Sequence, residues 1–87
     1  MDNVVVWLSE WFKRKVSKDK DISQYLEVNY FEAGFIDSLG IFELILAIER
    51  NYNIRFSEKH FQDRRFATIS GLAAIISELV ITGGKSQ

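Results

Sequence analysis

Ser38 occupies the position in this chain that best suits covalent chemistry. It follows Asp37 and stands just before residues 41–49, the most amphipathic run in the sequence. A Ser or Asp directly before such a run is a signal of a helix N-cap, whose side-chain oxygen accepts a hydrogen bond from an unpaired first-turn N–H group. We therefore expect Ser38 to lie where a loop meets a helix, with its hydroxyl near solvent and Asp37 beside it. On these residues alone, a plain capping role is the simpler explanation.

A nucleophilic role for Ser38 would require a base, and the sequence offers a poor one. His60 is the one histidine, and it stands on another predicted element. Asp37-Ser38-Leu39-Gly40 also lacks the Gly-x-Ser-x-Gly pattern of a hydrolase nucleophile elbow. A small esterase therefore remains only an alternative, and we predict no catalytic residues.

Metal binding is not predicted either. The chain has no cysteine and a single histidine, which excludes thiolate sites and leaves no ligand set for zinc. Asp19-x-Asp21-x-Ser23 resembles the start of a calcium loop, but Gln24 and Tyr30 stand where that motif needs Gly and Glu.

The length and composition indicate one globular domain. The chain has 87 residues, of which 47% are hydrophobic, enough for one core. We assign residues 1–82 to a single domain with a flexible tail at 83–87.

A net charge of −1 argues against a nucleic-acid partner. No apolar run approaches the roughly 20 residues that span a bilayer, and the first residues lack the basic start of a signal peptide. We expect a cytoplasmic monomer without a membrane partner.

The hydrophobic periodicity predicts an all-α fold. Three main helices are expected at residues 3–15, 38–52 and 69–81, with a short helix from Ser57 to residue 62 or 63. Residues 17–37 form a long first loop, and such a loop in a compact domain is usually functional. The expected architecture is a small antiparallel bundle of three main helices plus one short helix.

Apolar residues at helical spacing define the expected core. The stripe of the first helix consists of Val4, Trp7, Leu8, Trp11 and Phe12. The stripe of the last helix, capped by Thr68, consists of Ile69, Leu72, Ala73, Ile76, Leu79 and Val80. The long loop is expected to anchor itself through its apolar residues, which are Ile22, Tyr25, Leu26, Val28, Phe31 and Phe35.

The helix predicted at residues 38–52 has a wider apolar sector than a core requires. At about 100° per residue the sector spans about 220°, whereas burying one face needs somewhat over 100°. We assign four residues to the core, namely Leu44, Ile45, Ile48 and Tyr52. The remaining apolar residues then form an exposed partner-facing patch, consisting of Leu39, Phe42 and Leu46 and ringed by Glu43 and Glu49. The alternative is a helix buried on nearly all sides.

The region around Ser38 resembles the attachment site of the acyl carrier protein family. The resemblance rests on Phe31-x-x-Gly34-Phe35-Ile36-Asp37-Ser38-Leu39, followed by Glu43, Glu49 and residues 66–69, and it extends over about residues 4–80. It implies that Ser38 carries a 4′-phosphopantetheine arm, flanked by Asp37 and Leu39. It also implies a non-catalytic carrier that receives its arm from coenzyme A through a separate phosphopantetheinyl transferase.

By the same resemblance, the arm holds an acyl group as a thioester and presents it to acyl-loading and acyl-processing enzymes of fatty-acid, polyketide or related pathways. The partner surface would be Leu39, Phe42, Glu43, Leu46 and Glu49. The alternative from another class is an unmodified helical interaction module that uses the apolar sector of the same helix.

Four features depart from the usual pattern of the family. The chain is nearly neutral, Gly40 follows Leu39, Arg50 and Arg55 replace common acidic residues, and Ser57 replaces a frequent Pro. These departures indicate a specialised carrier with its own partners.

Overall fold

The computed structural model describes residues 3–16 and 21–81, and every regular element within them is helical. The four α-helices are α1 (Asn3–Lys15), α2 (Ser38–Tyr52), α3 (Glu58–Phe61) and α4 (Ile69–Ile81), and two 3₁₀ turns are η1 (Ile22–Gln24) and η2 (Arg64–Ala67). The predicted all-α class is confirmed, as are the bounds of the three main helices. The predicted tail at 83–87 lies outside the described residues.

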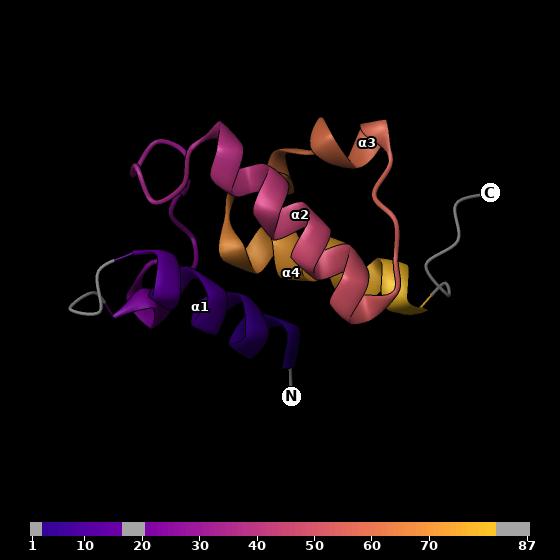
Figure 1. The fold of residues 1–87 in the computed structure, drawn as a ribbon, viewed down its shortest axis with the longest axis horizontal. Coiled ribbons are helices and arrows are strands. Elements are labelled where there is room, and N and C mark those ends of the chain that lie inside the picture. The colour runs from indigo at the N-terminus through magenta and orange to yellow at the C-terminus, as the bar shows by residue number, and fades with distance from the viewer. Residues whose placement is uncertain (1–2, 17–20, 82–87) are drawn as a thin grey trace.

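The three main helices pack as a small bundle (Figure 1). The magenta α2 crosses in front of α4, the indigo α1 lies below and runs against both, and α3 returns the chain above them. No helix within the described ranges is both long and apolar enough to cross a membrane.

The core lies between α1, α2 and α4, and α4 contributes most to it. Six residues of α4 are buried, whereas α2 buries Leu44 and Ile48 alone. Full burial of one aliphatic side chain stabilises a fold by about 1.5–3 kcal/mol. The main contributors have no exposed surface, namely Phe12, Leu8, Tyr30, Leu44, Ile48, Ile69, Leu72, Ile75 and Ile76. The predicted stripe of α1 is confirmed, with Trp7 half-buried and the other four members buried.

The predicted stripe of α4 was wrong at one position and incomplete at another. Val80 is 46% exposed, whereas Ile75, which the stripe omitted, is fully buried. Val80 belongs to the last turn and stands next to the exposed Ile81. Helix α4 packs against both α1 and η2, so its buried surface is wider than the predicted stripe and includes Ile75.

The long loop is fastened to the start of α4. The Tyr30 N–H donates to the Ala67 carbonyl at 3.0 Å, and the Ser70 N–H donates to the Leu26 carbonyl at 3.0 Å. The Tyr30 hydroxyl donates to the carbonyl of Phe66, and its ring lies 5.0 Å from that of Phe12 between centroids. These contacts hold the loop across one end of the bundle.

The anchors of this loop differ from the predicted set. Ile22 is buried, and Tyr25, Leu26 and Phe35 are half-buried, as expected. Val28 and Phe31 are exposed, and the main anchor is Tyr30, which was not among the predicted anchors. Tyr30 can act as an anchor because a carbonyl satisfies its hydroxyl inside the core. The loop also contains the short turn η1.

Helices α3 and α4 begin with side-chain hydrogen bonds at their caps. Thr68 Oγ1 accepts from the Gly71 N–H at 3.0 Å, which confirms the predicted cap of α4. Before α3, His60 Nδ1 accepts from the Ser57 N–H at 2.9 Å. The short helix predicted from Ser57 ends at Phe61.

Candidate functional site at the start of α2

Helix α2 is capped by Asp37. Its Oδ1 accepts a hydrogen bond from the Gly40 N–H at 2.8 Å, and its backbone is extended, with φ −108°. Ser38 is the first helical residue. The cap therefore belongs to Asp37, and the capping role considered for Ser38 is wrong.

Ser38 is exposed and has no competing partner within the described residues. Its hydroxyl makes no hydrogen bond there, and neither do the N–H groups of Ser38 and Leu39. Free N–H groups at the positive end of a helix dipole attract anions. The site therefore combines an accessible hydroxyl with donors that suit a phosphate ester on that hydroxyl.

Two glycines shape the approach to Ser38. Gly34 has φ +77°, in the left-handed region that glycine adopts without steric cost. This turn lets the Phe35 N–H donate to the Tyr30 carbonyl at 3.0 Å. At Gly40 a Cβ atom would lie 2.8 Å from Ile36 Cγ1 and 3.2 Å from Asp37 Oδ1, so the missing side chain lets the loop close onto the first turn. A packing reason thus accounts for Gly40, one of the four departures from the family pattern.

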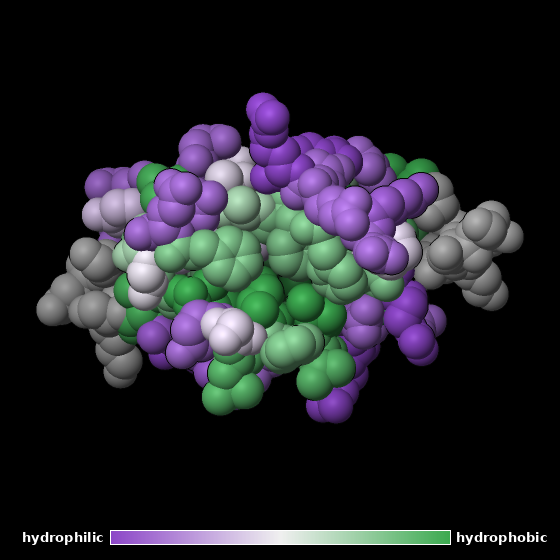
Figure 2. All heavy atoms as spheres, turned by 90° about the horizontal axis from the view of Figure 1, so that it is seen from above, coloured by the Kyte–Doolittle hydropathy of each residue, from purple (hydrophilic) through white to green (hydrophobic). Residues whose placement is uncertain are grey.

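The apolar sector of α2 is divided as the sequence predicted. Leu39, Phe42 and Leu46 are 68%, 65% and 60% exposed. Leu44 and Ile48 are fully buried, and Ile45 and Tyr52 pack half-buried against the core. The alternative of a helix buried on nearly all sides is wrong. Figure 2 shows an extended hydrophobic area bordered by hydrophilic residues on the face that carries the start of α2 and α3.

Both glutamates of the predicted partner surface have intramolecular partners. Glu43 Oε1 lies 2.5 Å from Lys15 Nζ, and both side chains are about half exposed. Glu49 is half-buried, and its Oε2 accepts from the Phe56 N–H at 3.0 Å. Sequence reasoning missed Lys15, because it is 28 residues away from Glu43 and no local pattern connects the two.

His60 is committed elsewhere, which removes support from the esterase alternative. Its Nδ1 lies 3.0 Å from Ser57 Oγ and also accepts the Ser57 N–H. Among the residues that the structure describes, His60 makes no hydrogen bond to Ser38, and no cluster of three His, Cys, Asp or Glu side chains is placed to hold a metal ion.

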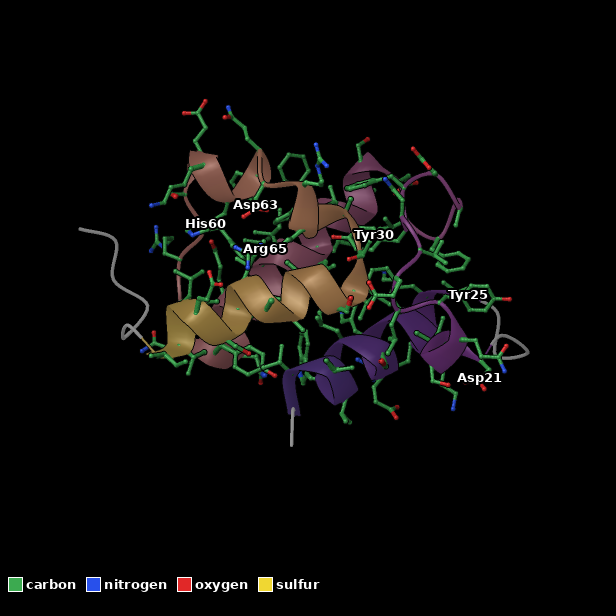
Figure 3. All side chains as sticks on the ribbon, turned by 180° about the vertical axis from the view of Figure 1, so that it is seen from behind. Asp21, Tyr25, Tyr30, His60, Asp63 and Arg65 are labelled. Atoms are coloured by element: carbon green, nitrogen blue, oxygen red, sulfur yellow. The ribbon has the colours of Figure 1, made fainter. Side chains whose placement is uncertain are left out.

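A charged cluster away from Ser38 lies between α3 and α4, where Figure 3 labels Asp63 and Arg65. Arg65 bridges Asp63 at 2.9 Å and Glu78 at 2.8 Å. Hydrogen bonds from Arg65 hold the pKa values of both carboxyl groups below their usual range. This cluster joins η2 to α4 and contributes nothing to the site at Ser38.

Comparison with known proteins agrees with this geometry. Residues 7–76 match the family model described as a phosphopantetheine attachment site. Similar proteins include the D-alanyl carrier proteins of Streptococcus pyogenes serotypes M5 (strain Manfredo), M49 (strain NZ131) and M1. Each is 32% identical over 60 residues, which cover 69% of this chain and 76% of the relative. No solved structure resembles the chain closely enough to count as a match.

The family match covers most of the chain, and the relatives agree with it over a shared length of 60 residues. The chain therefore belongs to the family of non-catalytic carrier proteins that hold a covalently attached 4′-phosphopantetheine.

Proposed function

We propose that Ser38 is the attachment residue and that this carrier holds its acyl or aminoacyl group as a thioester on an arm linked to the Ser38 hydroxyl. The observation that carries the proposal is the state of Ser38, exposed at the start of α2 with its hydroxyl unbonded among the described residues. Asp37 supports it by capping the helix, which leaves Ser38 free.

The attachment requires a separate phosphopantetheinyl transferase. The Ser38 oxygen forms a bond to the phosphorus of the coenzyme A pyrophosphate that carries pantetheine. The bond from that phosphorus to the bridging oxygen breaks, and adenosine 3′,5′-bisphosphate leaves. The serine proton passes to a base of the transferase, since the carrier has none hydrogen-bonded to Ser38 among the described residues. The free N–H groups of Ser38 and Leu39 are placed to stabilise the resulting phosphodiester.

We also propose that loading and processing enzymes dock on the exposed patch of α2, Leu39, Phe42 and Leu46, with Glu43 and Glu49 at its edge. Exposed apolar patches rimmed by polar groups mark interaction sites. Since Glu43 is paired with Lys15 and Glu49 with the Phe56 N–H, the apolar residues carry most of this contact.

The names of the relatives support an aminoacyl group as one candidate cargo. They are named D-alanyl carriers, so an aminoacyl group stands beside a short acyl group as a candidate cargo. Loading by an enzyme that activates D-alanine tests the aminoacyl cargo, and release of the loaded group by hydroxylamine shows that it is held as a thioester. We place the carrier in the cytoplasm, where coenzyme A is available.

The intact mass of the protein after incubation with coenzyme A and a promiscuous phosphopantetheinyl transferase tests the attachment. Wild type and Ser70→Ala should each gain one phosphopantetheine, and Ser38→Ala should gain none. Ser70 is a matched control because it also stands in the first turn of a helix, but its hydroxyl donates to Glu27 at 2.7 Å. Absence of a gain in wild type with several transferases would instead favour the unmodified interaction module.

A further inference from the structure

A pocket of about 450 Å³ lies beside Ser38, between the end of α1 and the start of α2. Its lining comes from the loop residues 34–37, from Leu39, Gly40 and Glu43 of α2, and from Lys15 of α1. Sites for small molecules typically measure about 300–1,000 Å³. The pocket is thus large enough for a small organic group.

The lining combines apolar walls with charged groups. Phe35, Ile36 and Leu39 supply apolar surface, and Lys15, Asp37 and Glu43 supply charge. A pantetheine arm has the same mixture, because a branched hydrocarbon centre is flanked by a hydroxyl, two amides and a phosphodiester. A plain fatty-acyl chain would match only the apolar part.

The position of the pocket favours the arm over a free ligand. Asp37 and Leu39, the neighbours of Ser38 on either side, both line it. A group bound to the Ser38 oxygen therefore starts at the rim of the pocket. Tethering gives it an effective concentration in the millimolar range, so weak contacts are enough to hold it.

Lys15 adjusts the charge of the pocket. Its ammonium pairs with Glu43 at 2.5 Å and lies 5.4 Å from the centroid of the Trp11 ring. Among the described lining residues Lys15 is the one cation beside the carboxylates of Asp37 and Glu43, and it pairs with Glu43. Without it, both carboxylates, and not Asp37 alone, would stand uncompensated beside a phosphodiester at Ser38.

We propose that the pantetheine arm, once attached at Ser38, rests in this pocket with Lys15 as its cationic neighbour. The inference rests on the proposed attachment at Ser38. It gives the carrier a resting state in which the arm lies between α1 and α2 until a partner enzyme draws it out.

Nuclear Overhauser contacts between an unlabelled arm and ¹³C,¹⁵N-labelled protein test the proposal. Intact mass first establishes that the arm is attached. The proposal expects contacts from the geminal methyl groups of the arm to Phe35 and Ile36, and a shift of the Gly34 amide signal well above that of Gly71, which does not line the pocket. Attachment alone will disturb residues 37–40, so Gly34 and Phe35 are the deciding positions.

Lys15→Met provides the matched test of charge, with Lys13→Met on the exposed side of the same helix as its control. The arm contacts to Phe35 should weaken at least severalfold in Lys15→Met and stay unchanged in Lys13→Met. A fully attached arm without contacts to Phe35 or Ile36 would overturn the inference while leaving the attachment at Ser38 intact. A protein that never gains the arm would instead overturn the proposed function.

Discussion

Helices α2 and α4 each have a serine in their first turn, Ser38 and Ser70, and the two serines have different surroundings. At α4 the loop covers the helix start, so the Ser70 hydroxyl donates to Glu27 and its N–H to the Leu26 carbonyl. At α2 the Asp37 side chain caps the helix by accepting from the Gly40 N–H, and Ser38 stays exposed. The same helix-start signal therefore marks a serine that binds the loop in one place and an exposed serine in the other, and tertiary contacts decide which.

The two helices differ in the same way along their length. Six apolar side chains of α4 lie in the core and only the last two of the helix, Val80 and Ile81, are exposed, whereas α2 buries two and keeps three large apolar side chains in solvent. Helix α4 contributes most of the core, and α2 keeps apolar surface exposed.

The largest effect on stability is expected from the buried face of α4. Ile76→Ala removes a side chain with no exposed surface and should lower the free energy of unfolding by about 2–5 kcal/mol. Leu46→Ala on α2 should change it by less than about 0.5 kcal/mol, because the side chain is already solvated. Urea denaturation of both variants measures the contrast, and equal losses would contradict the division between the helices.

A second prediction concerns the fastening of the loop. Tyr30→Phe removes the hydroxyl that donates to Phe66 and leaves a buried carbonyl unpaired, so it should cost about 1–3 kcal/mol in urea denaturation. Arm loading should be unchanged at temperatures where the variant is folded. An unaltered urea midpoint would show that the Tyr30 hydroxyl adds nothing to the backbone hydrogen bonds and the packing that hold the loop at α4.

The same tyrosine predicts an alkaline limit to stability. Burial raises the pKa of Tyr30 far above its ordinary value of 10.0, so above that pH the unfolded chain loses a proton that the folded chain keeps. The Tyr30 contribution is present below pH 10 and should decline above it. The decline should be absent in Tyr30→Phe, as followed by circular dichroism against pH.

The exposed face of α2 is predicted to matter for partners. Phe42→Ala and Leu46→Ala should each reduce kcat/KM of a loading enzyme about tenfold, since truncating a central apolar anchor of an interface costs more than about 1 kcal/mol. Val80→Ala provides the control, because Val80 is also partly exposed but stands at the far end of α4. Equal losses of kcat/KM for all three variants would contradict a docking surface on α2.

The smallest effect is expected at the charged cluster of η2 and α4. Arg65→Met should raise the pKa values of Asp63 and Glu78 toward their ordinary range, whereas Arg64→Met should leave both pKa values unchanged. Because the folded state lowers both pKa values, their contribution is present at neutral pH and is lost as the pH falls through them. Carboxyl ¹³C titration measures the change, and arm loading should not respond.

The sequence carried enough local information to predict the helices and the exposed patch of α2. Hydrophobic spacing gave the bounds of the main helices, and the excess width of the apolar sector of α2 indicated that Leu39, Phe42 and Leu46 stay in solvent. Both features depend on residues a few positions apart.

The features that sequence reasoning missed depend on contacts between distant residues. Tyr30 is an anchor because the carbonyl of Phe66 meets its hydroxyl, 36 residues away. Lys15 meets Glu43 across the bundle. At residues 37 and 38 both side chains suit a cap, and only the backbone geometry assigns the cap to Asp37.

Localisation of the arm by fragmentation mass spectrometry tests the central claim most directly. The arm-bearing protein is digested, and every serine-containing peptide is searched for the characteristic loss of the pantetheine group. The account predicts that the arm is found on Ser38 and never on Ser70. An arm on Ser70, or on any serine other than Ser38, would contradict it.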